Sequence, residues 1–178
     1  RRQRQMCIRD RFNNGAYAIP GALEDMPTDA IRTIFETNVF GWHSLTRLII
    51  PVMRAQGHGR IIQCSSILSF VTLAYRGPYN ATKWPIEGLS DTLRLELEGS
   101  GIHVISIRPG PINTKFRVNS IPHFEKWIDK NSSYLKIAYD EELIPRLFDP
   151  SQASIFQLEA QAVTKKVVRA LESRRPSM

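Results

Sequence analysis

Apolar residues recur every three to four positions between Pro27 and Gly57, which is the repeat of one helix face. The apolar positions are Ile31, Ile34, Phe35, Leu45, Leu48, Ile49 and Val52. We predict a helix that has Thr28 as its N-cap, carries Asn38 on its apolar face, and bends near Pro51.

Short apolar runs alternate with helical patterns in the rest of the chain. We predict buried strands over residues 61–66 and 102–107. Between them, a helix that ends at Gly99 has an apolar stripe at Ile86, Leu89, Leu93 and Leu97. Alternating helices and buried strands indicate a parallel α/β sheet.

Composition limits the class of protein. The chain has 178 residues, enough for one domain with a sizeable core. Apolar residues make up 42% and charged residues 23%, which argues against disorder. No apolar run approaches the roughly 18 residues that span a membrane, and the N-terminus lacks the apolar core of a signal peptide. We therefore expect a cytoplasmic protein with no membrane partner.

The net charge of +7 is typical of nucleic-acid binders, but its distribution argues against that class. Residues 1–11 carry +4 of this charge, with five arginines against Asp10, and the rest of the chain is only mildly basic. The aromatic residues of a nucleic-acid groove are lacking. Two cysteines cannot form a disulfide framework, and the four histidines have no ligand spacing, so we predict no metal site.

Tyr79 and Lys83 form the pattern that carries chemistry. They are four residues apart, and this spacing places both side chains on one face of a helix. A neighbouring ammonium favours the phenolate, so we expect Lys83 to lower the pKa of Tyr79 from its usual value of about 10. Such a phenol can act as a general acid or base. A solvated helix face can have the same spacing, so the surrounding motifs decide between the two interpretations.

Five motifs, one of which contains this pair, follow one another in a definite order. They are Phe12–Ala16, Thr37–Gly41, Gly59–Ser66, Gly77–Lys83 and Arg108–Thr114. In that order and at those separations they resemble the short-chain dehydrogenase/reductase family, from about Phe12 to the C-terminus. The resemblance implies a Rossmann-type, doubly wound parallel sheet of the α/β class, with NAD or NADP as the cofactor. It also implies hydride transfer between the cofactor and a carbonyl or alcohol.

The resemblance implies a role for each matching residue. Tyr79 exchanges a proton with the substrate oxygen, and Lys83 lowers the Tyr79 pKa and binds the nicotinamide ribose. Ser66 hydrogen-bonds the substrate oxygen, and Asn38 holds a water linked to the lysine; helix capping or kinking is the alternative for Asn38. The implied catalytic set is Asn38, Ser66, Tyr79 and Lys83. The implied cofactor-binding set is Asn13, Gly15, Tyr79, Lys83, Pro109, Gly110 and Thr114.

Three features depart from the family pattern. Gly15 and Ala16 stand in inverted order, which leaves the backbone contact with the cofactor open. Pro85 falls inside the expected helix, so either the helix begins late or Lys83 is displaced. The glycine-rich turn that lets a pyrophosphate approach a helix N-terminus is missing, because the Gly57–Gly59 segment precedes a strand.

The missing turn leads us to expect that the chain contains only part of the domain. We interpret residues 12–178 as the C-terminal part of a single Rossmann-type domain, incomplete because the first strands are absent. Residues 1–11 show no clear periodicity, and we interpret them as an extraneous or disordered basic segment, with a native basic arm as the alternative. Residues 115–150 scatter aromatics among polar residues, which suggests a substrate lid or a surface insertion that packs down.

These observations predict an NAD(P)-dependent oxidoreductase that interconverts an alcohol and a ketone or aldehyde. The lid aromatics favour a bulky apolar substrate, such as a steroid, retinoid or lipid-like carbonyl. We expect the complete protein to form a homodimer or homotetramer and to bind no nucleic acid. The alternative is an inactive fragment that cannot bind cofactor and acts at most through association of its Asn38 and Tyr79 helices.

Residues 1–178 alone should show no saturable binding of NADH or NADPH. The reason is the missing pyrophosphate turn, together with an open sheet edge. Isothermal titration with each dinucleotide, beside a thermal melt, measures this. Micromolar binding with a cooperative melt would show instead that the chain is self-sufficient.

Overall fold

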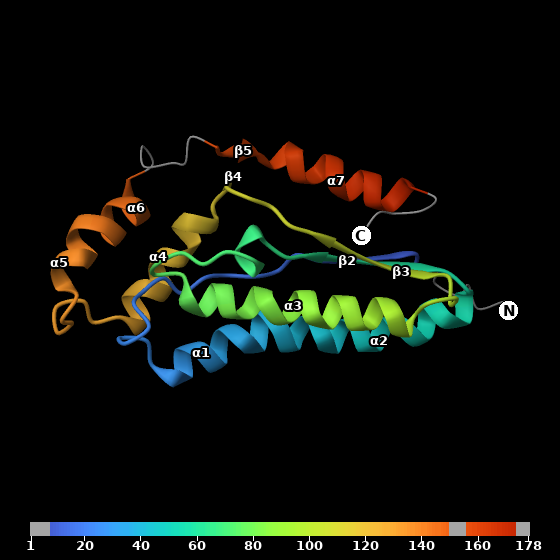
Figure 1. The fold of residues 1–178 in the computed structure, drawn as a ribbon, viewed down its shortest axis with the longest axis horizontal. Coiled ribbons are helices and arrows are strands. Elements are labelled where there is room, and N and C mark those ends of the chain that lie inside the picture. The colour runs from blue at the N-terminus through green and yellow to red at the C-terminus, as the bar shows by residue number, and fades with distance from the viewer. Residues whose placement is uncertain (1–7, 150–155, 174–178) are drawn as a thin grey trace, which may run out of the picture.

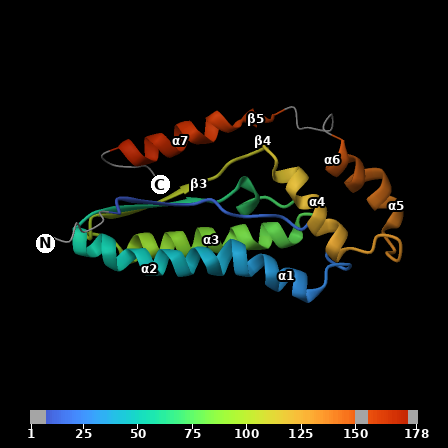
Figure 2. The same ribbon diagram turned by 180° about the vertical axis from the view of Figure 1, so that it is seen from behind.

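The computed structural model describes residues 8–149 and 156–173 and shows a parallel sheet with helices on both faces. The strands are β1 (Asp10–Asn13), β2 (Gly59–Cys64) and β3 (Ile102–Ile107), in the order β1-β2-β3. In both views, one face is covered by α2 (Gly41–Gln56) and α3 (Gly77–Glu96), and the other by α7 (Ala160–Glu172) (Figures 1 and 2). The predicted α/β class with a parallel sheet is therefore confirmed.

β1 begins within the segment that the sequence assigned to the basic N-terminus. Asp10 and Arg11 pair in parallel with Arg60 and Ile61 of β2. The backbone N–H of Arg60 also donates to the carbonyl of Arg9, at 2.9 Å. Asp10 and Arg11 thus belong to the sheet, and the Arg9 carbonyl adds a hydrogen bond, because an outer strand with partly exposed side chains can accept charged residues. Residues 1–7 lie outside the described residues.

The sheet buries apolar side chains on both faces. On one face, Ile61 belongs to a buried cluster with Met53 of α2 and Leu97 at the end of α3. On the other face, Ile62 belongs to a cluster with Ala170 of α7. Burial on both faces explains why these strands are nearly continuous apolar runs in the sequence.

The helix predicted between Pro27 and Gly57 consists of three segments. α1 (Thr28–Phe35) leads into a π-helical turn (Glu36–Phe40), which continues into α2. The prediction of Thr28 as the N-cap is wrong: Pro27 occupies that position, no side chain caps the helix, and Thr28 is already helical.

α3 runs through Pro85 without ending. It begins at Gly77, eight residues earlier, so a late helix start does not account for the proline. With 20 residues α3 is the longest described helix, yet neither it nor any other described helix is long and apolar enough to cross a membrane.

The predicted lid region, which the structure describes over residues 115–149, lies at one end of the sheet (Figure 1). Its helices are α4 (Phe116–Trp127), α5 (Lys136–Ala138), a π-helical segment (Tyr139–Leu143) and α6 (Ile144–Phe148). Two short strands flank it, β4 (Ile112–Asn113) before and β5 (Leu158–Glu159) after, and they pair in parallel. β5 leads directly into α7, so the lid lies between two paired segments.

The lid aromatics have more than one role. Phe124 and Tyr139 are buried in a cluster with Ile34 of α1, and the Tyr139 hydroxyl donates to Asp25 Oδ2 at 2.7 Å. Tyr134, in contrast, is 96% exposed. Phe124 and Tyr139 therefore pack into the core, and the substrate-lid role of this region stays a prediction.

Gly101 should be the least replaceable glycine in the described structure. Its φ is +76°, and an added Cβ would lie 2.2 Å from the carbonyl oxygen of Gly57. We expect Gly101→Ala to lower the free energy of unfolding of the complete protein by about 3 kcal/mol, from backbone strain plus the clash. Gly99→Ala is the matched control, since its φ is +74° with nothing within 4 Å. Equal losses in urea denaturation would contradict the role of the clash.

Candidate active site

One face of α3 carries three polar side chains on successive turns. Tyr79, Lys83 and Glu87 are each four residues apart, so they follow one another along the helix. Lys83 and Glu87 are buried, and Tyr79 is half-buried. The sequence predicted the first two as site residues and did not identify Glu87, although the same spacing includes it.

The ammonium of Lys83 is directed to the end of β2. Its Nζ donates to the carbonyl of Cys64 at 2.8 Å and lies 4.4 Å from the ring centroid of Trp42 on α2. Burial lowers the pKa of Lys83 from 10.5 to about 8, while the negative charges of Cys64 and Glu87 act in the opposite direction. Lys83 therefore gains and loses its proton close to neutral pH.

Tyr79 is a weaker acid in this environment than a tyrosine in water. Burial raises the pKa of Tyr79 to about 12, and the negative charge of Cys64 acts in the same direction. A hydrogen bond with Ser66 and the charge of Arg76 lower it only in part. The lowered pKa expected from Lys83 is therefore not found, because desolvation dominates and the Nζ atom is bonded to the β2 backbone.

Ser66 lies just after β2, in the loop that faces Tyr79. β2 ends at Cys64, two residues before the predicted end of the strand, so Ser65 and Ser66 belong to the loop. The Ser66 hydroxyl accepts a hydrogen bond from the backbone N–H of Leu68 at 3.1 Å and caps a short 3₁₀ turn. This bond, together with the interaction with Tyr79, fixes its orientation.

Asn38 sits in the π-helical turn and is fully buried. Its Oδ1 accepts from the N–H of Tyr17 at 3.1 Å, and its Nδ2 donates to the Tyr17 carbonyl at 2.9 Å and to Thr82 Oγ1 at 3.2 Å. Both Nδ2 hydrogens are therefore used within the protein. The side chain fastens the Tyr17 backbone to α3, and the water-holding role implied by the family resemblance stays a prediction.

Asn13 and Gly15 are held away from the open side of the site. The Asn13 side chain donates to Gln63 Oε1 at 2.8 Å, inside the layer between the sheet and α2. The carbonyl of Gly15 accepts from Trp42 Nε1 at 2.7 Å. Their cofactor contacts therefore stay predictions, and the adjacent Asn14 and Ala16 are the residues that border the cleft.

A partly buried ion pair connects α3 to the loop after β3. Arg108 donates from Nε and Nη2 to the two carboxylate oxygens of Glu87, at 3.0 and 2.8 Å. The next residue, Pro109, accepts a hydrogen bond from the N–H of Ile67 at 3.0 Å. The pair thus positions the Pro109–Gly110 segment beside the Ser66 loop, and two-point contacts of this kind fix geometry as well as adding energy.

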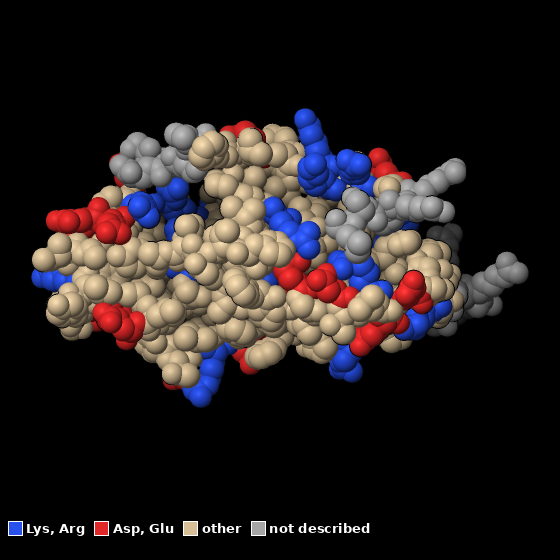
Figure 3. Space-filling view, in the orientation of Figure 1, with Lys and Arg blue, Asp and Glu red and all other residues tan. Residues whose placement is uncertain are grey.

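These segments enclose a cleft of about 970 Å³ at the carboxyl ends of the strands. Of the predicted residues, the cleft is lined by Ser66, Tyr79, Lys83, Pro109, Gly110 and Thr114. Asn13, Gly15 and Asn38 are not in its lining. Figure 3 shows the molecule hollowed between the lid helices and α7, with Lys and Arg atoms in blue beside the hollow.

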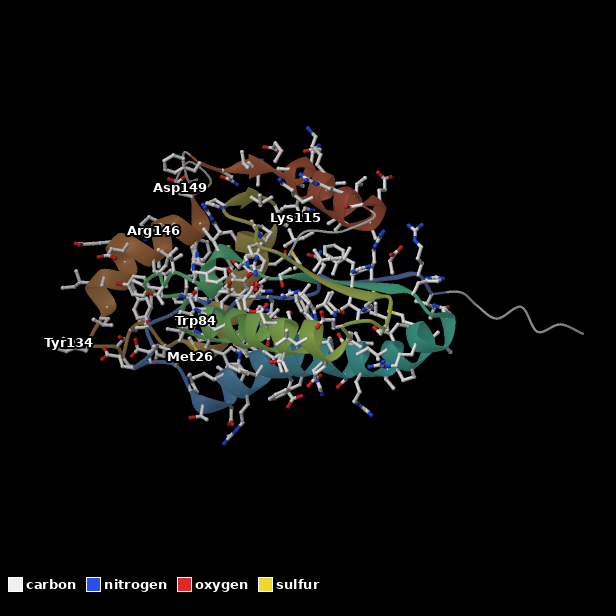
Figure 4. The ribbon with its side chains drawn as sticks, turned by 45° about the vertical axis from the view of Figure 1, so that its right-hand side comes forward. Met26, Trp84, Lys115, Tyr134, Arg146 and Asp149 are labelled. Atoms are coloured by element: carbon white, nitrogen blue, oxygen red, sulfur yellow. The ribbon has the colours of Figure 1, made fainter. Side chains whose placement is uncertain are left out.

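The lining also contains residues that the sequence did not reveal. They are Arg76 before α3, Arg117 on α4 and Arg146 on α6. Arg146 is labelled in Figure 4. No sequence signal marked them, because their positions are spread over 71 residues and only the fold brings them to one cleft.

Comparison with known proteins identifies the relatives of this chain. The family model described as short chain dehydrogenase matches residues 11–123. The uncharacterized oxidoreductase YbbO of Escherichia coli K12 is 34% identical over 172 residues, covering 97% of this chain and 57% of that protein. The chain therefore spans little more than half the length of this relative.

Solved structures of related proteins have a similar fold. A short-chain dehydrogenase from Streptomyces avermitilis superposes with a TM-score of 0.73 and 27% identity, over 95% of this chain and 58% of that one. A putative NAD(P)-dependent gluconate 5-dehydrogenase from Beutenbergia cavernae, solved with bound NADP, gives a TM-score of 0.63 and 26% identity. That match covers 65% of this chain and 46% of the other.

Lys83 should make the stability of the complete protein depend on pH when no cofactor is added. Its pKa of about 8 lies below 10.5, so the folded protein binds fewer protons than the unfolded chain between these values. The free energy of unfolding should therefore rise with pH across this window, by roughly 3 kcal/mol at most.

Lys83→Met should remove this rise, as measured by urea denaturation at pH 7.5 and 10 relative to wild type. Lys136→Met, at an exposed position on α5, is the control for loss of a lysine. The same pH dependence in wild type and Lys83→Met would contradict the shifted pKa.

Proposed function

The chain belongs to the short-chain dehydrogenase family, and we propose that Tyr79, Lys83 and Ser66 are the active-site residues of an NAD(P)-dependent alcohol or carbonyl oxidoreductase. The observation that supports this most directly is their convergence on one cleft at the carboxyl ends of the parallel strands. Oxidoreductase is the activity class of its relatives.

Tyr79 is the proton donor in this proposal. With a pKa of about 12 its phenol is protonated at neutral pH, which is the form that a general acid requires. The site is therefore suited to carbonyl reduction, in which the substrate oxygen takes up a proton. Donation leaves a phenolate, and the nearby Arg76 lowers the cost of that charge.

Ser66 and Lys83 support the same step. The Ser66 hydroxyl accepts from Leu68 and hydrogen-bonds Tyr79, so it is held beside the proton donor, where it can turn its proton to the substrate oxygen. The Nζ of Lys83 lies 5.5 Å from the ring centroid of Tyr79, near enough for the charged form to favour the phenolate. Release of Nζ from the Cys64 carbonyl would bring this cation to bear on the phenol or on a ribose hydroxyl.

The cofactor class is NAD or NADP, as the family and a neighbour solved with NADP indicate. When bound, the nicotinamide supplies or accepts the hydride. The cleft suits such a group: Ser65 Oγ lies buried in its wall without a hydrogen-bond partner among the described residues, and Lys83 and Thr114 border it. Ser65 and Thr114 are available to bind the polar nicotinamide end.

The substrate that we propose is a bulky carbonyl compound. The cleft is large for a small ketone, and the Leu73, Phe116 and Leu143 side chains give it an apolar part. Phe116 also packs edge-on against Tyr79, with ring centroids 5.2 Å apart, so an apolar group there would lie beside the proton donor.

A homodimer or homotetramer is the assembly that we propose for the complete protein. Leu45 and Leu48 on α2 and Leu89 on α3 are exposed apolar side chains. Apolar side chains on adjacent helices of this kind are typical of contact surfaces between copies.

Tyr79→Phe in the complete protein should reduce kcat by about 10²- to 10⁴-fold, because it removes the phenolic proton. The dissociation constant for NADPH or NADH should change little, since the rest of the cleft is kept. Steady-state kinetics on a ketone panel and cofactor fluorescence titration measure the two effects. Tyr134→Phe, at a 96% exposed position, is the control. Retention of more than about a tenth of the activity would rule out Tyr79 as the acid.

A further inference from the structure

Three arginines line the substrate side of the cleft. Arg76 precedes α3, Arg117 lies in the first turn of α4, and Arg146 lies on α6. They thus come from three separate segments, two of them in the lid. Figure 4 labels Arg146 on α6 and Lys115 at the start of α4.

The lining of the cleft is basic, and no acidic side chain in the described part of that lining balances its positive charge. Its described lining contains five lysines and arginines and no aspartate or glutamate. The charges of Arg117 and Arg146 both act on Arg76, and after burial they are the causes that lower the pKa of Arg76. Arg117 and Arg146 are therefore each close enough to repel Arg76, which is unfavourable unless an anion joins them.

The arginines near the cleft fall into two groups, those paired with a carboxylate and those without one. Arg108, in the loop after β3, is bound at two points by the buried carboxylate of Glu87. Within residues 8–149 and 156–173, no hydrogen bond or ion pair engages the guanidinium of Arg76, Arg117 or Arg146. Planar guanidinium groups match carboxylate and phosphate oxygens at two points, so unpaired ones in a cleft are suited to an anionic ligand.

We propose that the substrate carries a carboxylate or phosphate group, held by Arg76, Arg117 and Arg146 beside the carbonyl that Tyr79 protonates. This inference rests on the proposed carbonyl reduction and specifies its substrate class. Arg76 stands three residues before Tyr79, and its charge acts on the Tyr79 phenol, so the anionic group lies near the reacting oxygen. Leu73, Phe116 and Leu143 then contact the apolar remainder, and the substrate is amphipathic.

The test uses the complete protein and two pairs of probes, in which one member carries the anionic group and the other is its neutral counterpart. 4-Oxodecanoate is compared with its methyl ester, and hydroxyacetone phosphate with hydroxyacetone, by isothermal titration in the presence of NADPH and by kcat/KM. We expect one or both anions to bind at least about tenfold better than their neutral partners, the size of one charge-assisted hydrogen bond. The arm that shows the larger ratio identifies carboxylate or phosphate as the anionic group.

Variants of the arginines then show which of them cause the preference for the anionic probes. Arg117→Gln and Arg146→Gln should each reduce the anion-to-neutral ratio by about tenfold. Arg117→Lys should keep more of the ratio than Arg117→Gln, because it retains the charge. Arg32→Gln is the control on α1, at an exposed ion pair with Asp29, and should leave the ratio unchanged.

The outcomes separate the two proposals. Equal binding of both anions and their neutral partners would overturn the anionic substrate. So would weaker NADPH binding in the arginine variants with the ratio intact, since the arginines would then serve the cofactor. An undiminished Tyr79→Phe would instead overturn the proposed acid, while the anion preference measured by titration would stand.

Discussion

Burial of the Lys83 ammonium against the end of β2 is the constraint on which the rest of the site depends. An isolated buried cation costs several kcal/mol, so its surroundings must supply compensating contacts. The Cys64 carbonyl, the face of Trp42 and the more distant Glu87 carboxylate provide them. These groups come from β2, α2 and α3, and satisfying one ammonium therefore fixes the distance between the sheet and both helices.

The same helix face extends this constraint to the loops. One turn beyond Lys83, Glu87 binds Arg108 at two points and so connects α3 to the segment that follows β3. The Ser69 hydroxyl lies 3.3 Å from the same carboxylate, which attaches the Ser66 loop as well. Removal of Arg108 would leave the buried Glu87 carboxylate without its cation, which is destabilising. One row of side chains on α3 thus carries the proposed proton donor, its neighbouring cation and the support of both loops.

The sequence was sufficient to predict the features that follow from periodicity. It was not sufficient to predict those that depend on burial. Apolar runs located β2 and β3, and the four-residue spacing located Tyr79 and Lys83 on one helix face. The same pattern could not reveal the π-helical turn at Asn38, because a single widened turn barely changes the apolar repeat. It also gave the wrong direction for the Tyr79 pKa, since sequence spacing fixes a neighbour but not its desolvation.

The substrate prediction was limited in the same way. Aromatics scattered through the lid suggested an apolar ligand, but Phe124 and Tyr139 are used in the core beneath it. The arginines that reach the cleft were hidden in a chain whose body is only mildly basic. What distinguishes them is their pairing: Arg108 is matched by Glu87, whereas the cleft lining offers Arg76, Arg117 and Arg146 no carboxylate. A structural arginine has its anion within the fold, and an arginine that lacks one in a cleft is placed to receive its anion from the ligand.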